Sequence, residues 1–183
     1  GEGPVASALW FALEFFGHKN VKVLNGGFRK WVKERRAVTQ DAPKVEKKKF
    51  TAVPHPEKVV TVDAVKKRDR NTVLADARSF KEFIGQDVVP GASRGGHIPA
   101  AVHLEWTQLA ADLETFKSAD EIKKVLEKKG ITKGTKAITY CQIGFGRSTM
   151  LELGMRLVGY DSSRLYSGSW QDWSADPRLP LEK

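Results

Sequence analysis

The fold of this chain is decided by the segment Tyr140-Cys141-Gln142-Ile143-Gly144-Phe145-Gly146-Arg147-Ser148-Thr149. The apolar run 136–140 predicts a buried strand, and residues 147–160 carry apolar side chains at helical spacing. Cys141 is therefore expected on a glycine-bearing turn between the end of a strand and the start of a helix. Backbone N–H groups in such a turn point into an anion-sized hollow, and the helix dipole strengthens its preference for anions.

Cys141 is the only cysteine, and its position predicts a lowered thiol pKa and a partly ionised, nucleophilic sulfur. The alternative is a small buried hydrophobic residue without chemistry. A nucleophile facing this hollow favours covalent chemistry on a small anion or an anionic group. The predicted anion-binding residues are those that follow the cysteine, Gln142, Ile143, Gly144, Phe145, Gly146 and Arg147. Arg147 is the expected cation, because its planar fork suits sulfonate or phosphate oxygens.

Composition limits the possible partners. The 183 residues carry a net charge of +9, which suits anionic substrates. The densest basic run, residues 47–49, lies in a polar stretch with prolines and is interpreted as a solvated linker, so no nucleic-acid partner is expected. No apolar run is long enough to span a membrane, and one cysteine and four unclustered histidines predict no metal site. No cofactor is expected, and the compartment is left open between cytoplasm and periplasm.

An internal match links the two ends of the chain. Residues 23–31 resemble residues 165–173, and three pairs share the offset of 142 positions: Gly17 and Gly159, Gly26 and Gly168, Trp31 and Trp173. At the same offset, residues 4–17 fall on the predicted helix 146–159. The chain is thus expected to contain the last helix, strand and helix of one domain and then a second, complete copy.

The expected boundaries follow from this match. Residues 1–36 form the C-terminal remnant of the first copy, residues 37–56 a proline-containing linker, and residues 57–183 the complete catalytic domain. The remnant is too small to close a core alone. We therefore expect the missing N-terminal half-domain in the same polypeptide or in a separate chain.

Strands and helices alternate through the second copy. Strands are expected at 59–62, 72–75, 101–104, 136–140 and 164–166, with helices between them. Ser118 and Glu121 form a candidate capping box for one of these helices. This alternation predicts an α/β fold with a parallel sheet flanked by helices, and ligands bind beyond the carboxyl ends of such strands. Cys141 and Asp76 both lie at such ends.

The motifs together resemble the rhodanese family of sulfurtransferases, the thiosulfate sulfurtransferases, in its tandem-domain form. The matching segments are Asp76-Ala77-Arg78, Gly96-His97-Ile98-Pro99-Ala100-Ala101, the Cys141 loop, Gly168-Ser169-Trp170, Asp176-Pro177 and Leu179-Pro180. The resemblance covers nearly the whole chain and implies a rhodanese-like fold preceded by the end of an inactive first domain.

The resemblance implies a double displacement. The Cys141 thiolate would take the outer sulfur of thiosulfate or a similar small anionic donor and would then pass it from a persulfide to a thiol, or to cyanide in vitro. Asp76 and Arg78 would support the site by pairing beneath it, and Arg94, in the long loop 86–99, is a candidate contact for incoming anions.

Two features depart from the family pattern. The usual sulfurtransferase loop has six residues, whereas Cys141 to Arg147 makes seven, as in the phosphate loops of cysteine-dependent phosphatases and arsenate reductases. Glu82 also stands where some thiosulfate-using members place an arginine. The alternatives are therefore a phosphatase or arsenate reductase on the same scaffold, and a non-catalytic or persulfide-relay binding module.

Overall fold

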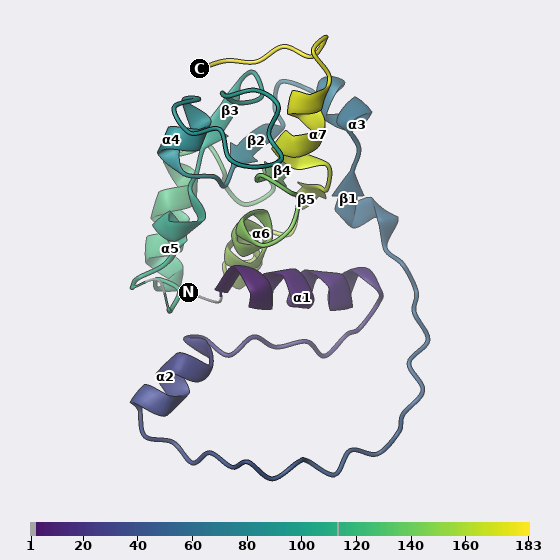
Figure 1. Cartoon of the computed structure of the whole chain (residues 1–183), viewed down its shortest axis with the longest axis vertical. Coiled ribbons are helices and arrows are strands. Elements are labelled where there is room, and N and C mark those ends of the chain that lie inside the picture. Colours follow the sequence, from purple (N-terminus) through teal and green to yellow (C-terminus); the bar gives the residue numbers. More distant parts are fainter. Residues whose placement is uncertain (1–2, 113) are drawn as a thin grey trace.

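The computed structural model describes residues 3–112 and 114–183 and contains a five-stranded sheet (Figure 1). The strand order is β1-β5-β4-β2-β3, and every neighbouring pair is parallel. The strands are β1 (Val59–Val60), β2 (Val73–Asp76), β3 (Ala101–His103), β4 (Ala137–Tyr140) and β5 (Ser163–Tyr166). The prediction of a parallel α/β sheet is confirmed.

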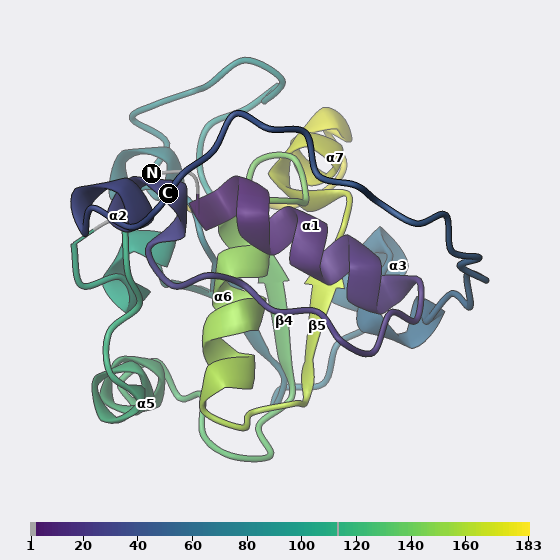
Figure 2. The same cartoon turned by 90° about the horizontal axis from the view of Figure 1, so that it is seen from below.

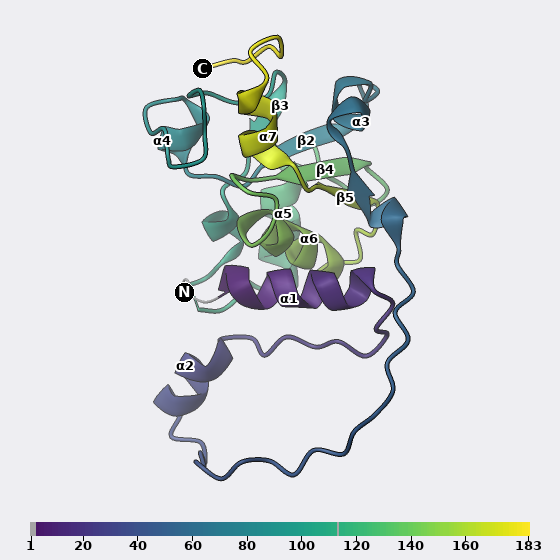
Figure 3. The same ribbon diagram turned by 45° about the vertical axis from the view of Figure 1, so that its right-hand side comes forward.

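Helices cover both faces of this sheet. In Figure 3 the sheet lies between α3 and α7 on one side and α5 and α6 on the other. These elements, with the short α4 at the sheet's edge, are α3 (Val62–Lys66), α4 (Phe80–Phe83), α5 (Ala119–Glu127), α6 (Arg147–Leu157) and α7 (Ser169–Ala175). Short 3₁₀ turns occupy Pro56–Lys58 and Trp106–Leu109.

The alternation of side chains along β4 decides which face holds the nucleophile. Ile138 and Tyr140 pack with Trp170 in the core under α7, whereas Ala137 and Cys141 belong to the core with Leu151 of α6. Successive side chains of a strand point to opposite faces, so Cys141 is directed toward α6. Burial of each large apolar side chain in these cores contributes about 1.5–3 kcal/mol.

Two capping boxes fix helix starts. Ser118 accepts a hydrogen bond from the Glu121 N–H, and the Glu121 carboxylate accepts from the Ser118 N–H, which confirms the predicted start of α5. Ser79 and Glu82 repeat this arrangement at the start of α4.

The N-terminal residues pack onto the sheet domain through α1 (Gly3–Phe15), which crosses α6 (Figure 2). Trp10 and Phe11 form a buried cluster with Leu153 and Leu165. Two side-chain contacts between the helices join residues 142 positions apart: Ser7 Oγ lies 2.9 Å from Thr149 Oγ1, and Arg156 donates to Glu14 over 3.0 Å. This separation equals the offset of the internal sequence match.

One sequence prediction for this region is wrong. Residues 16–26 contain no strand, although their counterparts in the second copy include β5. β5 forms because β1 and β4 supply its hydrogen-bonding partners, and residues 21–24 pair with no strand among the described residues. The short helix α2 (Gly27–Lys33) does form. Residues 36–55, which are neither helix nor strand, connect it to the sheet domain. Within the described ranges, no helix has the length and apolar character needed to cross a bilayer.

Candidate active site

Cys141 lies directly after β4, where its backbone is fixed by the start of α7. Its N–H donates to Ser169 Oγ over 3.0 Å, and its carbonyl accepts from the Trp170 N–H over 3.0 Å. The side chain is 1% exposed and lies at a cavity of about 470 Å³. This cavity is lined by Pro4, Val5, Ala8, Cys141, Gln142, Ile143, Phe145, Gly146 and Arg147. The structure thus brings Cys141 together with most of the loop residues expected from the sequence.

The loop has spare hydrogen-bond donors. The N–H groups of residues 142–145 have no acceptor among the residues that the structure describes. Ser148, fully buried in the first turn of α6, places its hydroxyl 3.4 Å from Cys141 Sγ and 2.8 Å from the Gly144 carbonyl. Unpaired N–H groups beside a helix start can bind an anion, and the Ser148 hydroxyl can turn its single proton from the Gly144 carbonyl to an ionised sulfur.

Arg147 lines the cavity but is already paired. Its two terminal nitrogens donate to the Glu82 carboxylate over 2.5 and 2.9 Å, from helix α6 to helix α4. Burial alone would raise the pKa of Glu82, but the hydrogen bonds and charge of Arg147 and the bonds from Ser79 outweigh it, and this pKa lies below its usual value. The pair is therefore ionised at neutral pH, and Glu82 neutralises the cation expected to bind substrate.

Asp76 and Arg78 lie beneath the site at the end of β2. The carboxylate accepts from Arg78 Nε over 3.0 Å and from a terminal nitrogen over 2.6 Å. The guanidinium also donates to the Gly96 carbonyl and stacks over the ring of Trp170, 4.6 Å from its centroid. Both side chains are buried, so this pair ties together β2, the long loop and α7 without facing the cavity.

Arg94 does not contact the site, which corrects the expectation that it meets incoming anions. Its guanidinium donates to four backbone carbonyls, those of Trp173, Ser174, Asp176 and Leu179. All its donor nitrogens are committed to the C-terminal segment, and it is absent from the cavity lining. Arg94 therefore anchors the long loop to the end of α7.

The side chain of Gln142 is 5% exposed, and neither polar atom of its amide has a hydrogen-bond partner among the described residues. A buried amide without a partner costs free energy, so it marks a place where a ligand oxygen could be bound.

Sequence reasoning missed several residues of the site. Ser148 and Ser169 lie in segments that the sequence analysis singled out, but neither serine was predicted to contact Cys141. The contribution of Pro4, Val5 and Ala8 depends on the packing of α1 against α6, which no local pattern reveals.

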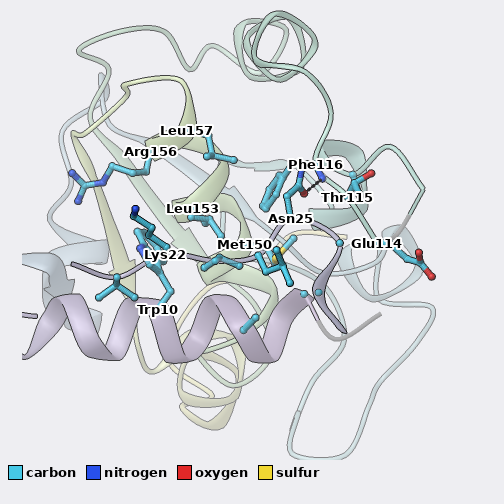
Figure 4. Close-up of a pocket in the computed structure, with 18 of the residues that line it drawn as sticks. Trp10, Lys22, Asn25, Glu114, Thr115, Phe116, Met150, Leu153, Arg156 and Leu157 are labelled. Atoms are coloured by element: carbon cyan, nitrogen blue, oxygen red, sulfur yellow. Dashed lines mark hydrogen bonds between the residues drawn. The ribbon is translucent and has the colours of Figure 1, made fainter. Parts of the chain in front are cut away.

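A larger cavity, of about 640 Å³, lies on another side of α6 (Figure 4). It is bounded by α1, residues 21–29, residue 110, residues 114–116 and α6, and Trp10, Met150 and Leu153 line it. Asn25 Oδ1 accepts from the Phe116 N–H over 2.9 Å at its edge, drawn as a dashed line in Figure 4. Its lining contains no thiol, so the chemistry is assigned to the Cys141 cavity. Among the described residues no cluster of three metal-ligating side chains is found.

Comparison with known proteins establishes the family. The model of the rhodanese-like domain matches residues 46–176. The chain belongs to the rhodanese-like family. A putative thiosulfate sulfurtransferase of Haloferax volcanii is 34% identical over 95% of this chain, and the sulfur carrier protein TtuD of Thermus thermophilus is 33% identical over 97%. This rhodanese-like chain spans 65% and 66% of the lengths of these two relatives.

Solved structures agree with this assignment. EanB in complex with ergothioneine superposes on the rhodanese-like chain with a TM-score of 0.87 and 28% identity, over 97% of this chain and 44% of EanB. Another EanB structure, with a TM-score of 0.85 and 28% identity over the same shares of both chains, holds ergothioneine covalently linked to a persulfidated cysteine. The family resemblance seen in the sequence is confirmed.

Proposed function

We propose that this rhodanese-like chain is a sulfurtransferase in which Cys141 carries the sulfur as a persulfide. The observation that carries the proposal is one buried thiol at the floor of a cavity, with unpaired loop N–H groups around it. The Cys141 thiolate attacks the outer, sulfane sulfur of a donor such as thiosulfate, the S–S bond of the donor breaks, and sulfite leaves. A thiol, or cyanide in vitro, then attacks the outer sulfur of the persulfide and regenerates the thiolate.

The persulfide form fits the surroundings of Cys141. The loop N–H groups and the Ser148 hydroxyl, 3.4 Å from Sγ, supply donors for the negative charge that both the thiolate and the persulfide carry. The sulfurtransferase-named relatives and the persulfidated cysteine of EanB support the same chemistry.

The seven-residue loop alone favours the phosphatase or arsenate reductase alternative. A phosphatase needs a carboxylic acid to protonate its alcohol leaving group, and the described residues that line the Cys141 cavity include no carboxyl group. Glu82 contacts the cavity-lining Arg147, and this ion pair keeps Glu82 deprotonated. Steady hydrolysis of an aryl phosphate would restore this alternative. A relay module would instead load sulfur without turnover unless a protein partner is added.

The proposal is tested by the intact mass of the protein after incubation with a sulfane-sulfur donor. We expect a gain of one sulfur atom, located on the Cys141 peptide and removed by cyanide with formation of thiocyanate. Loading from neither thiosulfate nor an aryl thiosulfonate would contradict the proposal.

Gly144 offers a test of the loop geometry. Its φ is +92°, and an added Cβ would lie 1.9 Å from the Ser167 carbonyl oxygen. The loop of Gly144→Ala must therefore shift, and a displacement of about 1 Å at a reacting group costs on the order of 100-fold in rate. We expect such a loss in the rate of sulfur loading, measured by quenched-flow mass spectrometry.

Gly159→Ala is the matched control for Gly144→Ala. Gly159 also has a positive φ, +75°, but nothing lies within 4 Å of an added Cβ. It should lose about 1 kcal/mol of stability and load sulfur at the wild-type rate. Equal loading rates in the two variants would show that the loop tolerates the shift.

We also propose that the front half of a second rhodanese-like domain, in the same polypeptide or in another chain, covers α1 around Leu9 and residues 21–32. Leu9 is 62% exposed, whereas Leu151, 142 positions later, is fully buried. Phe28 is 64% exposed, and its counterpart Trp170 is 1% exposed. These two positions are buried in the second copy and uncovered in the first, and the contacts between residues 142 apart support the same repeat.

Leu9→Ala and Leu151→Ala form a matched pair for this proposal. Leu151→Ala should lower the free energy of unfolding by about 2–5 kcal/mol because it leaves a cavity in the core. Leu9→Ala should change it by less than about 0.5 kcal/mol in this chain. Both values come from urea titrations at two protein concentrations. A large, concentration-independent cost at Leu9 would mean that this surface is already covered.

A further inference from the structure

The charge of the active site is unusual for a site that is to bind a dianion. Arg147 is the only charged side chain among the described residues that line the Cys141 cavity. Its guanidinium is bound at both terminal nitrogens by the Glu82 carboxylate, which is 5% exposed. The ion pair is neutral overall, so an ionised Cys141 leaves the site with a net negative charge. Each negative charge on an incoming donor meets that charge across a partly desolvated cavity.

The remaining donors of the site are uncharged. They are the unpaired N–H groups of residues 142–145, the Ser148 hydroxyl and the buried, unpartnered amide of Gln142. Neutral donors can bind the oxygens or the outer sulfur of a donor molecule, but each carries only a partial positive charge, whereas an unpaired guanidinium would supply a full one.

The rim of the cavity is apolar. Pro4, Val5 and Ala8 of α1 line it together with Ile143 and Phe145 of the loop. Val5 is 72% exposed and Ile143 60%, so these side chains present apolar surface at the entrance to Cys141. A donor that carries an apolar group would bury part of this surface and gain binding free energy from the apolar area removed from water. Thiosulfate has no such group.

We propose, on the basis of the sulfurtransferase function above, that Glu82 determines donor specificity by neutralising Arg147. The preferred donor is then a sulfane-sulfur compound with one negative charge and an organic group. For an organic thiosulfonate, Cys141–S⁻ attacks the outer sulfur of R–SO₂–S⁻, a new S–S bond forms on Cys141, and R–SO₂⁻ leaves. For an organic persulfide, R–S–S⁻, the same attack releases the thiolate R–S⁻ with its charge. Charge and atoms balance in both cases, and no outside oxidant or reductant is needed.

Three sulfur donors separate the effect of the donor's charge on the loading rate from the effect of its apolar group. Thiosulfate is a dianion, methanethiosulfonate is a small monoanion, and benzenethiosulfonate is a monoanion with a phenyl group. Each loading rate constant is divided by that of the same probe with free N-acetylcysteine, which removes intrinsic reactivity. The expected wild-type order is benzenethiosulfonate fastest and thiosulfate slowest. An organic persulfide, generated in the reaction mixture, serves as a fourth probe. It tests the second class of monoanionic donor, the persulfides.

Glu82→Gln tests the role of Glu82 directly. The glutamine keeps an oxygen that can accept from Ser79 but releases the charge of Arg147. The electrostatic work of bringing a donor to the site is proportional to the charge of the donor. Glu82→Gln should therefore change the activation free energy twice as much for thiosulfate as for a monoanion, so the gain in loading rate for thiosulfate should be about the square of the gain for the monoanions. We expect about a tenfold gain for thiosulfate and about a threefold gain for methanethiosulfonate, and both gains should shrink in high salt.

Glu121→Gln is the matched control, because Glu121 occupies the same position in the capping box of α5 and does not line the cavity. It should leave all normalised rates unchanged. Equal gains for dianion and monoanions in Glu82→Gln, or a wild type that prefers thiosulfate, would overturn the inference. If Glu82→Gln fails to fold, the order of the normalised loading rates of the wild type still tests the predicted preference for a monoanionic donor with an organic group. Loading from none of the probes would instead remove the sulfurtransferase function itself.

Discussion

Cys141→Ser is expected to abolish sulfur loading. Serine fits the space of a side chain that is 1% exposed, so the loop and its hydrogen bonds to Ser148 and Ser169 should be retained. Its hydroxyl does not ionise near neutral pH and cannot displace a leaving group from sulfur as a thiolate does. We expect no gain in mass and a fall of at least about 10³-fold in thiocyanate formation.

The readout is unambiguous because the chain contains no other cysteine that could accept the sulfur. Circular dichroism and urea unfolding of Cys141→Ser verify that the fold is retained. Persistence of cyanide-labile sulfur in this variant would show that another group carries it and would refute the role of Cys141.

Arg78→Met is expected to cause the largest loss of stability. Arg78 and Asp76 are both almost completely buried, and the guanidinium binds both oxygens of the Asp76 carboxylate. Methionine keeps the apolar stem and the backbone N–H of residue 78 still donates to the carboxylate, but the buried charge of Asp76 loses its cationic partner. Removal of one partner of a buried ion pair costs about 3–5 kcal/mol, measured here as the change in urea unfolding followed by tryptophan fluorescence.

The chain offers a surface copy of the same motif as a control. Arg178 donates through Nε and a terminal nitrogen to Asp176, two residues before it, but the Arg178 side chain is 87% exposed. Arg178→Met should therefore lower the free energy of unfolding far less than Arg78→Met does, because solvent screens an exposed ion pair. Adding Asp76→Asn to Arg78→Met should recover part of the loss, because the double variant buries no unpaired charge. If Arg78→Met and Arg178→Met lowered the free energy of unfolding equally, burial would not strengthen the Asp76–Arg78 pair.

The sequence predicted the fold well because helices, strands and capping boxes leave patterns among residues that are close together in the chain. The apolar run before Cys141 and the helical spacing after it identified β4 and α6, and the Ser118–Glu121 pair located the start of α5. The strand expected near Leu24 failed because strand formation depends on a partner, and none of the described residues supplies one.

The chemistry of the site was harder to predict because it depends on contacts between distant residues. Arg147 was located correctly at the start of α6, but its partner Glu82 lies 65 positions earlier. Arg94 was expected to meet anions, yet it bonds carbonyls 79 to 85 positions later. A basic side chain in a glycine-rich loop has the same sequence signature whether it binds a ligand or its own backbone.

The solitary thiol also affects how long transferred sulfur can stay on the protein. In a chain with a second thiol near the first, that thiol could attack the inner sulfur, expel hydrosulfide and close a disulfide. Cys141 has no such neighbour in these 183 residues, and its sulfur is buried beneath the loop. Internal discharge is therefore impossible within this chain, and bound sulfur should wait for an acceptor that arrives from outside.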